Sequence, residues 1–216
     1  MKKLLTILLF ASAFNLKAQT NYIITRDGQK VSIDWAASLS ISTEGYVDVF
    51  PKDGEKTPDG KKVITYKEPK YMRYEGRNWL TLPMGNPKFR YDWRIQEVLC
   101  WTDKYIMTNW EGENSYSILI FDWNLNLIKL RQARDYIDLQ KQAYAFNYKL
   151  NTKVFDKELK HFFEDCTAII NQVAKNNSSK EYTFTDGLSG LHCGTKDINT
   201  VIQGVVSGSL DHYPTK

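Results

Sequence analysis

The segment KYIMTNWEGENSYSILIFDWNLNLIKLRQ, residues 104–132, contains three runs rich in β-branched and aromatic residues. Two short groups, EGENS and NLN, separate these runs and consist mainly of polar residues and glycine. Such groups are typical of turns between neighbouring antiparallel strands, whereas parallel strands need crossover connections of about a dozen residues or more. The segment therefore predicts three strands of an antiparallel meander.

The same pattern extends toward the N-terminus. In YIITRDGQKVSIDW, residues 22–35, an Asp-Gly dipeptide separates two β-rich halves, which is a strong hairpin signal. Four further short runs are bounded by Gly, Pro or charged residues: GYVDVF (45–50), VITY (63–66), NWLTLP (78–83) and EVLCW (97–101). Residues 20–132 therefore predict an antiparallel β-sheet region, either a meander or a partly closed barrel.

After residue 132 the pattern becomes helical. Between Lys157 and Lys175 the apolar residues recur at helical spacing and form one stripe: Leu159, Phe162, Phe163, Cys166, Ile169, Ile170 and Val173. We expect this helix to pack on the sheet. DYIDLQKQAYAF (135–146) and INTVIQGVV (198–206) predict two shorter helices. Residues 133–216 thus form a helical C-terminal region that shares one core with the sheet, and the fold class is α+β.

The N-terminus, MKKLLTILLFASAFNLKAQ, has the pattern of a secretory signal peptide over residues 1–19. Two lysines precede an uncharged run that is too short to span a bilayer, which takes about 20 apolar residues. No later run is long enough either. We therefore expect an exported mature chain without a membrane span, located in the periplasm or outside the cell.

Removal of the signal peptide also changes the net charge. Residues 1–19 contain three lysines and no acidic residue, so cleavage lowers the formal charge from +4 to +1. Nucleic-acid binding relies on a surplus of basic side chains, so we expect no nucleic-acid partner. The chain has no phosphate-binding glycine loop and no Rossmann fingerprint, and we expect no cofactor. A protein or a glycan of the envelope or medium is the expected partner.

Five of the six tryptophans follow Asp or Asn, at irregular intervals that exclude a structural repeat. Neighbouring residues of a strand point to opposite faces, so a ligand site needs the Trp of one strand and the polar residue of another. Two interpretations remain. Either the Trp rings fill the core while Asp or Asn begins a turn, or Trp110 and Trp123, with exposed tyrosines, bind a glycan or a cell-wall fragment.

The three cysteines are Cys100, Cys166 and Cys193, and export favours their oxidation. One alternative is a disulfide between Cys166 and Cys193, which would fasten the late loop to the helix. In the other, all three thiols are free. A third role makes Cys193 the nucleophile of a small secreted hydrolase, with His161 or His192 as its base.

No metal site is expected. The histidines and cysteines lack C-x-x-C and H-x-x-x-H spacing, and Asp53, Glu55 and Asp59 do not match the calcium-loop pattern. No other group of residues has the spacing of a catalytic motif, so we assign no catalytic residue. The sequence favours a non-enzymatic exported protein that acts by surface binding or has a structural role in the envelope.

Three segments of the chain carry a resemblance: the signal peptide, the opening hairpin YIITRDGQKVSI, and the late run LKHFFEDCTAII with its F-x-D-C element, residues 163–166. In these segments the chain resembles uncharacterised secreted proteins of Bacteroidetes bacteria. A proline usually follows that cysteine, whereas this chain has Thr167. The resemblance implies export and a sheet followed by a helix, and it implies no activity and no catalytic residues.

Overall fold

The computed structural model describes residues 21–42, 45–84, 92–112, 115–134, 136–138, 143–145, 155–178 and 185–210. The predicted signal peptide, residues 1–19, lies outside the described residues.

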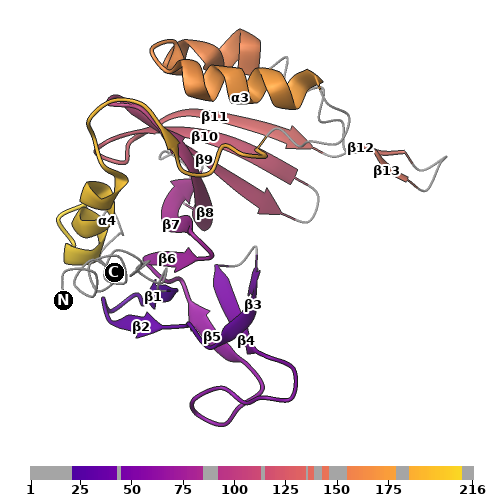
Figure 1. Ribbon diagram of the computed structural model, residues 1–216, viewed down its shortest axis with the longest axis vertical. Helices are drawn as coiled ribbons and strands as arrows, with labels where there is room; N and C mark the ends of the chain where they lie inside the picture. The colour runs from indigo at the N-terminus through magenta and orange to yellow at the C-terminus, as the bar shows by residue number, and fades with distance from the viewer. Residues whose placement is uncertain are drawn as a thin grey trace, which may run out of the picture.

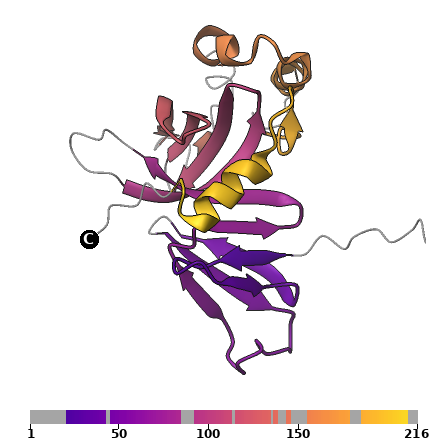
Figure 2. The same cartoon turned by 90° about the vertical axis from the view of Figure 1, so that its left-hand side faces the viewer.

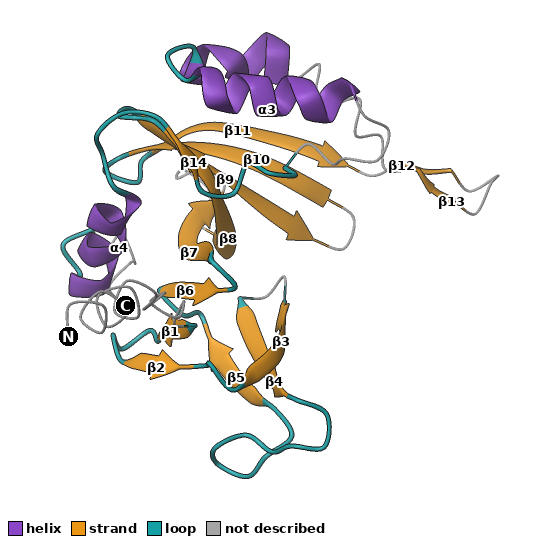
Figure 3. Cartoon of the chain, in the orientation of Figure 1, coloured by secondary structure: helices purple, strands orange, loops and turns teal. Residues whose placement is uncertain are grey.

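A large twisted sheet forms the centre of the molecule (Figures 1 and 3). Eight of its strands follow the order β11-β10-β9-β8-β7-β6-β1-β2, and all neighbours in this order are antiparallel. The bounds are β1 Tyr22–Ile24, β2 Lys30–Ser32, β6 Tyr71–Tyr74, β7 Arg77–Met84, β8 Asp92–Trp101, β9 Tyr105–Gly112, β10 Ser115–Asp122 and β11 Leu127–Arg134. The predicted meander and the opening hairpin are confirmed. Within the described residues the sheets do not close into a barrel.

A ninth strand, β14 (Leu191–His192), pairs with the end of β8 in parallel. Along β8, the pairing with β7 extends only from Asp92 to Val98. Beyond that point the Leu99 carbonyl accepts from the Gly190 N–H at 2.9 Å. Strand β14 thus occupies the edge of β8 that β7 leaves free. The sequence did not predict this strand, because it forms within a Gly-rich loop.

Three further strands form a separate small sheet in the order β3-β4-β5, with β3 at Ala36–Ile41, β4 at Tyr46–Pro51 and β5 at Ile64–Lys67. Strands β4 and β5 match predicted runs, whereas β3, with the sequence AASLSI, has few large β-forming residues and was not predicted. Val47 and Val49 of β4 are fully buried and pack against Met72 and Ile95 of the large sheet. The small sheet therefore covers one part of the large sheet.

Helix α4 (Ile198–Ser207) covers the opposite face of the large sheet and lies in front of it in Figure 2. The Asp197 side chain caps its N-terminus by accepting from the Asn199 N–H at 2.9 Å. One side of the helix is buried against the sheet, through Ile198, Val201, Ile202 and Val205. The prediction of a short helix over 198–206 is confirmed.

The long helix predicted from Lys157 to Lys175 is interrupted. The chain forms a π-helical turn, η1 (Phe155–Leu159), a 3₁₀ turn, η2 (Lys160–Phe163), and then α3 (Thr167–Ser178), which lies over β9 to β11 in Figure 1. A turn intervenes, and the Cys166 carbonyl starts α3 by accepting from the Ile170 N–H at 3.2 Å. The prediction of one continuous helix is therefore wrong.

The predicted packing of that segment against the sheet is confirmed, because most of the apolar stripe is still buried against the sheet despite the interruption. Its buried members are Leu159, Phe163, Cys166, Ile169 and Val173, which share one cluster with residues of β8, β9 and β10. Phe162 and Ile170 are only half-buried. The helical segment and the sheet thus share one core.

The helix predicted for residues 135–146 is also wrong. Its described residues form a short antiparallel pair, β12 (Tyr136–Asp138) and β13 (Ala143–Ala145). The central residues of the two strands are Ile137 and Tyr144, which are paired in register. Both residue types favour strands. Residues 133–216 therefore contain short strands as well as helices. No helix in the described part of the chain is long and apolar enough to cross a bilayer.

Candidate ligand pocket between the two sheets

One aromatic and two polar side chains lie in one row across the large sheet. Trp79 of β7 is directly opposite Glu97 of β8, and Glu97 is directly opposite Asn109 of β9. Residues paired in this way share a face of the sheet, with Cβ atoms about 4.5 to 5.5 Å apart. The row continues to apolar residues at both ends, Met72 beside Trp79 and Ile118 beside Asn109. Two polar side chains, those of Glu97 and Asn109, therefore lie between apolar or aromatic ones.

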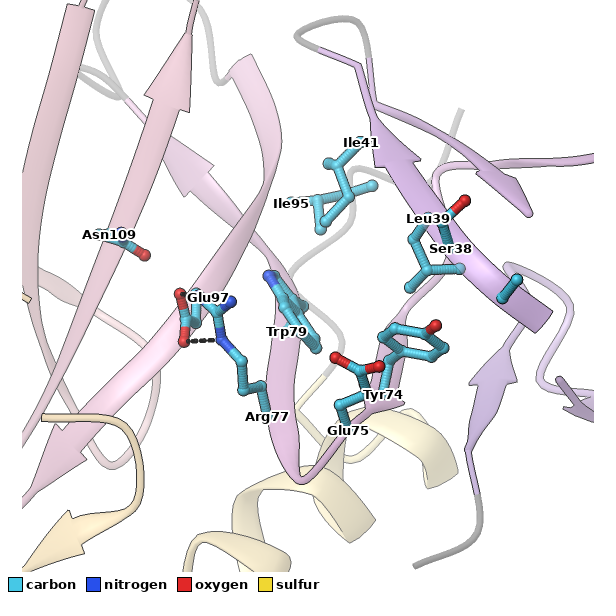
Figure 4. A pocket seen from close by; sticks show the side chains of 11 residues that line it. Ser38, Leu39, Ile41, Tyr74, Glu75, Arg77, Trp79, Ile95, Glu97 and Asn109 are labelled. Carbon is cyan, nitrogen blue, oxygen red and sulfur yellow. Dashed lines mark hydrogen bonds and ion pairs between the residues drawn. The ribbon is translucent and has the colours of Figure 1, made fainter. Parts of the chain in front are cut away.

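An open pocket of about 510 Å³ lies where this row meets the small sheet (Figure 4). We call it the inter-sheet pocket. Residues of β7, β8 and β9 form one wall, and residues 37–39 and Ile41 of β3 form the other. Leu39 and Ile41 point toward Trp79 and Ile95 in Figure 4, and the small residues Ala37 and Ser38 complete that wall. Its size is typical of small-molecule sites, which range from about 300 to 1,000 Å³.

Arg77 and Glu97 form a bidentate ion pair inside the pocket. The Arg77 Nε donates to Glu97 Oε1 at 2.7 Å, and Nη2 donates to Oε2. The Glu97 side chain is only 6% exposed, whereas the Arg77 side chain is 53% exposed. The guanidinium carbon also lies 5.2 Å from the centroid of the Trp79 ring. Arg77 therefore neutralises the buried carboxylate and covers part of the indole.

Asn109 is 9% exposed, and it lines the pocket next to Glu97. Its side-chain amide, which offers two donors and one acceptor, forms no hydrogen bond with any residue that the structure describes. Polar groups buried to this degree are nearly always hydrogen-bonded. Asn109 thus keeps its hydrogen-bonding capacity on the pocket side of the sheet.

The turn between β6 and β7 sets the edge of the pocket. Tyr74 and Arg77 are paired across a two-residue turn, Glu75-Gly76, in which both residues have positive φ, 49° and 78°. This is the pattern of a type I′ hairpin turn, whose twist matches that of the strands. The backbone of Glu75 has a conformation that favours glycine or asparagine. The Glu75 side chain lines the pocket. The turn therefore fixes Tyr74 and Arg77 at the pocket edge.

The two tryptophans chosen from the sequence, Trp110 and Trp123, do not line the inter-sheet pocket. Both rings are half-buried and pack against the core under α4, on the other face of the sheet. The Trp123 Nε1 donates to the Thr102 carbonyl at 3.0 Å, and the Lys196 ammonium lies 5.0 Å from its ring centroid. These contacts favour the core interpretation, and ligand binding by the two rings stays a prediction.

Asp122 shows why Asp precedes Trp at this position. Its carboxylate accepts from the backbone N–H groups of Asn124 and Asn126, both at 2.9 Å, in the turn after β10. The expectation that the polar residue begins a turn while Trp packs inward is confirmed for Asp122 and Trp123.

Cys166 and Cys193 form a disulfide, with their Cα atoms 5.5 Å apart. The bond links the start of α3 to the loop around β14, and the third cysteine, Cys100, is free and buried. Burial raises the pKa of the Cys100 thiol well above its usual range. Of the alternatives left open by the sequence, the structure contains the Cys166 to Cys193 bridge.

The hydrolase interpretation of Cys193 is not supported, because a sulfur held in a disulfide is not a nucleophile. His192, its neighbour, stacks on Trp101 with ring centroids 4.9 Å apart. His161, the other proposed base, contacts the ring of Phe162. Among the described residues, no three His, Cys, Asp or Glu side chains gather in a way that could hold a metal ion.

The sequence did not identify Trp79, Glu97 or Asn109 as a site. Trp79 and Asn109 belong to two of the Asn-Trp pairs, but one pair contributes its Trp and the other its Asn. This is the combination that the alternation of strand faces demands, a Trp of one strand and a polar residue of another. Choosing the right pairs required the register between β7, β8 and β9, which the sequence alone does not supply.

Comparison of the chain with protein-family models, with curated proteins and with solved structures found no match. The resemblance to secreted Bacteroidetes proteins stays an expectation from the sequence. The residues of the inter-sheet pocket are therefore the basis for a functional proposal.

Proposed function

We propose that the mature chain is an exported, non-enzymatic binding protein and that the inter-sheet pocket is its binding site. The observation that carries this proposal is the row of Trp79, Glu97 and Asn109 at the wall of an open pocket. Ligand sites commonly combine an apolar or aromatic lining with a few placed polar groups. A structural role alone gives no reason for an ion pair and an unpaired amide in the middle of a core face.

Two features support export. Residues 1–19 have the composition of a signal peptide, and the Cys166 to Cys193 disulfide fits an oxidising compartment such as the periplasm or the medium. The proposed partner is a soluble or envelope-bound molecule that reaches the pocket from the outside of the protein.

The pocket can be blocked without removing a core side chain. Ile41 is 36% exposed, lines the pocket and points toward Ile95 in Figure 4, so Ile41→Trp places a large ring in the pocket. Ser40 lies on the same strand, is exposed and does not line the pocket, so Ser40→Trp is the matched control. Both changes affect exposed positions, where substitutions usually alter stability by less than about 0.5 kcal/mol.

The test is a thermal-shift screen of the mature chain against neutral sugars, sugar acids, short peptides and amino acids. We expect at least one class to raise the melting temperature, through binding to the folded state. Ile41→Trp should abolish the shift and Ser40→Trp, on the opposite face of β3, should retain it. The proposal is wrong if no class stabilises the protein, or if Ile41→Trp responds as fully as the parent chain.

A further inference from the structure

We propose that the inter-sheet pocket recognises a neutral carbohydrate, with a sugar ring against Trp79 and a neighbouring pair of hydroxyls bound by Glu97 and Asn109. This inference rests on the proposed binding function and names the class of its ligand. It uses three observations: the hydrogen-bonding capacity left in the row, the position of the indole, and the charge of the pocket.

The remaining hydrogen-bonding capacity suits hydroxyl groups. Each oxygen of the Glu97 carboxylate accepts one bond from Arg77, which leaves about two of its four lone-pair sites. The Asn109 amide, directly opposite on β9, has no partner in the described part of the chain. A hydroxyl donates and accepts at once, so two adjacent hydroxyls could donate to Glu97 and accept from the Asn109 amide. The exposed fractions are 5% for residue Glu97 and 9% for Asn109, so both residues are largely buried.

Trp79 supplies the apolar complement. The ring is half-buried and lines the pocket in the same row as the two polar groups (Figure 4). Arg77 lies over the indole at 5.2 Å and fixes it from one direction. A sugar ring has C–H groups on its faces and hydroxyls on its rim, so it can contact an indole and a polar pair at the same time. A purely apolar ligand would leave Asn109 unpaired.

The charges disfavour an acidic ligand. Arg77 is already paired with Glu97, and Glu75 adds a second carboxylate at the pocket edge. The ionised side chains that line the pocket thus carry one positive and two negative charges. A phosphate or a sugar acid would be placed beside two carboxylates with no unpaired lining cation to receive it, which is unfavourable. The pocket volume of about 510 Å³ suits one or two sugar rings.

An extended peptide is the competing ligand class. Consecutive residues 37–39 line the pocket, so it meets the edge of β3, and β3 is the outer strand of the small sheet. A peptide could pair with that edge as an added strand. Such pairing would use the backbone of β3, and it would give no role to the Asn109 amide on the far wall. The observations on the row therefore favour the sugar.

The experiment follows two NMR signals during titration of the mature chain, the side-chain amide of Asn109 and the indole N–H of Trp79. The probes are cellobiose, maltose and N,N′-diacetylchitobiose as neutral disaccharides, a disaccharide containing a uronic acid, and a short extended peptide rich in Val and Thr. We expect at least one neutral disaccharide to shift both signals and the acidic one to bind more weakly. Failure of all three neutral disaccharides to shift them overturns the carbohydrate inference.

Variants separate recognition from folding. Asn109→Leu removes the amide at similar size and should weaken the binding of that disaccharide by about tenfold or more. It should not lower the melting temperature, because the amide has no partner in the described structure to lose. Asn171→Leu, on the exposed side of α3, is the matched control and should bind as the parent chain does. Unchanged affinity in Asn109→Leu would contradict the assigned contact.

The outcomes also distinguish this inference from the proposed function. If the peptide binds, is blocked by Ile41→Trp and is unaffected by Asn109→Leu, the pocket is a binding site for another class of ligand. The carbohydrate inference is then wrong while the binding function stands. If no probe binds and the wider thermal-shift screen is also negative, both are wrong.

Discussion

One face of the large sheet is covered in two different ways. Around Cys100, Met107 and Ile118, the helical segment presents large apolar side chains, Leu159, Phe163 and Ile169, which are all at most 1% exposed and share one apolar cluster with the sheet. We call this the closed half. Around Trp79, Glu97 and Asn109, strand β3 forms the other wall of a pocket that stays open. We call this the open half.

The difference lies in the covering element and in the sheet residues beneath it. The closed half has Met107 and Ile118 on the sheet, and Phe163 packs in the same cluster. In the open half the sheet has Glu97 and Asn109, which gain little from contact with apolar side chains. The open half therefore has two polar side chains at the wall of a pocket, where the closed half has packed apolar side chains. Four predictions test this contrast.

The largest effect is expected in the closed half. Phe163→Ala removes a fully buried ring and should lower the free energy of unfolding by about 3 to 5 kcal/mol, through lost transfer energy and a residual cavity. Denaturant unfolding of the mature chain measures the change. Lys160→Ala, in the same 3₁₀ turn but exposed, is the control and should change stability little. A small effect of Phe163→Ala would show that the closed half is not tightly packed.

Loss of the disulfide should have the next largest effect. The bond spans 27 residues and restricts the unfolded chain, so its removal should cost about 2 to 4 kcal/mol. The Cys166→Ala/Cys193→Ser double variant can be compared with the parent chain in denaturant. Because the bond lies in the closed half, the Trp79 indole N–H signal should stay in place in the native state. A large movement of that signal would show that the two halves are coupled.

A third effect concerns the loop that the disulfide anchors, residues 188–197, which we call the β14 loop. Gly194 has φ +100°, and a Cβ there would lie 2.3 Å from the Asp103 carboxyl carbon. Gly194→Ala should therefore destabilise the fold by about 1 to 2 kcal/mol, measured by thermal unfolding. Gly190→Ala is the matched control, since Gly190 also has positive φ but no atom within 4 Å of its Cβ position. Equal effects of the two changes would mean that the contact with Asp103 adds nothing.

The sequence correctly predicted the elements that are specified by residues close together in the chain. The Asp27-Gly28 hairpin, the meander from β9 to β11 and helix α4 all formed as expected, because turn residues and periodicity specify them. Strand β3 escaped prediction because Ala and Ser carry little β preference. It exists through pairing with β4, and that pairing is visible only in the fold.

Long-range contacts account for the other differences. The stripe from Leu159 to Val173 fits a continuous helix, and it carries no sign of the turn that separates Phe163 from Cys166. The candidate site escaped prediction for the same reason. Trp79 and Asn109 are 30 positions apart in the chain and join Glu97 through strand register. No local window of the sequence contains that row.

The smallest effect is a pH dependence confined to the closed half. The backbone N–H groups of Lys196 and Thr195 donate to Asp103 Oδ1 at 2.9 and 2.7 Å, and they hold the pKa of this carboxyl below its ordinary value of 3.8. A carboxyl with a lowered pKa in the folded state stabilises that state fully above its unfolded pKa, and the contribution is lost as the pH falls through the folded pKa. We therefore expect the β14 loop to loosen only when the pH falls below 3.8, the ordinary pKa of this carboxyl.

The amide signal of Thr195 reports this change in an NMR titration from about pH 6 to about pH 2. It should move in the acid range, below pH 3.8, as protonation weakens the bond from Thr195 to Asp103. Asp103→Asn removes the titrating group, so the same signal should lose this transition. The Trp79 indole signal should not follow the Asp103 transition, because Asp103 lies at the β8 to β9 turn and does not line the pocket. If the Thr195 transition persists in Asp103→Asn, another group causes the acid response. If the Trp79 signal shows the same transition, the open and closed halves are coupled.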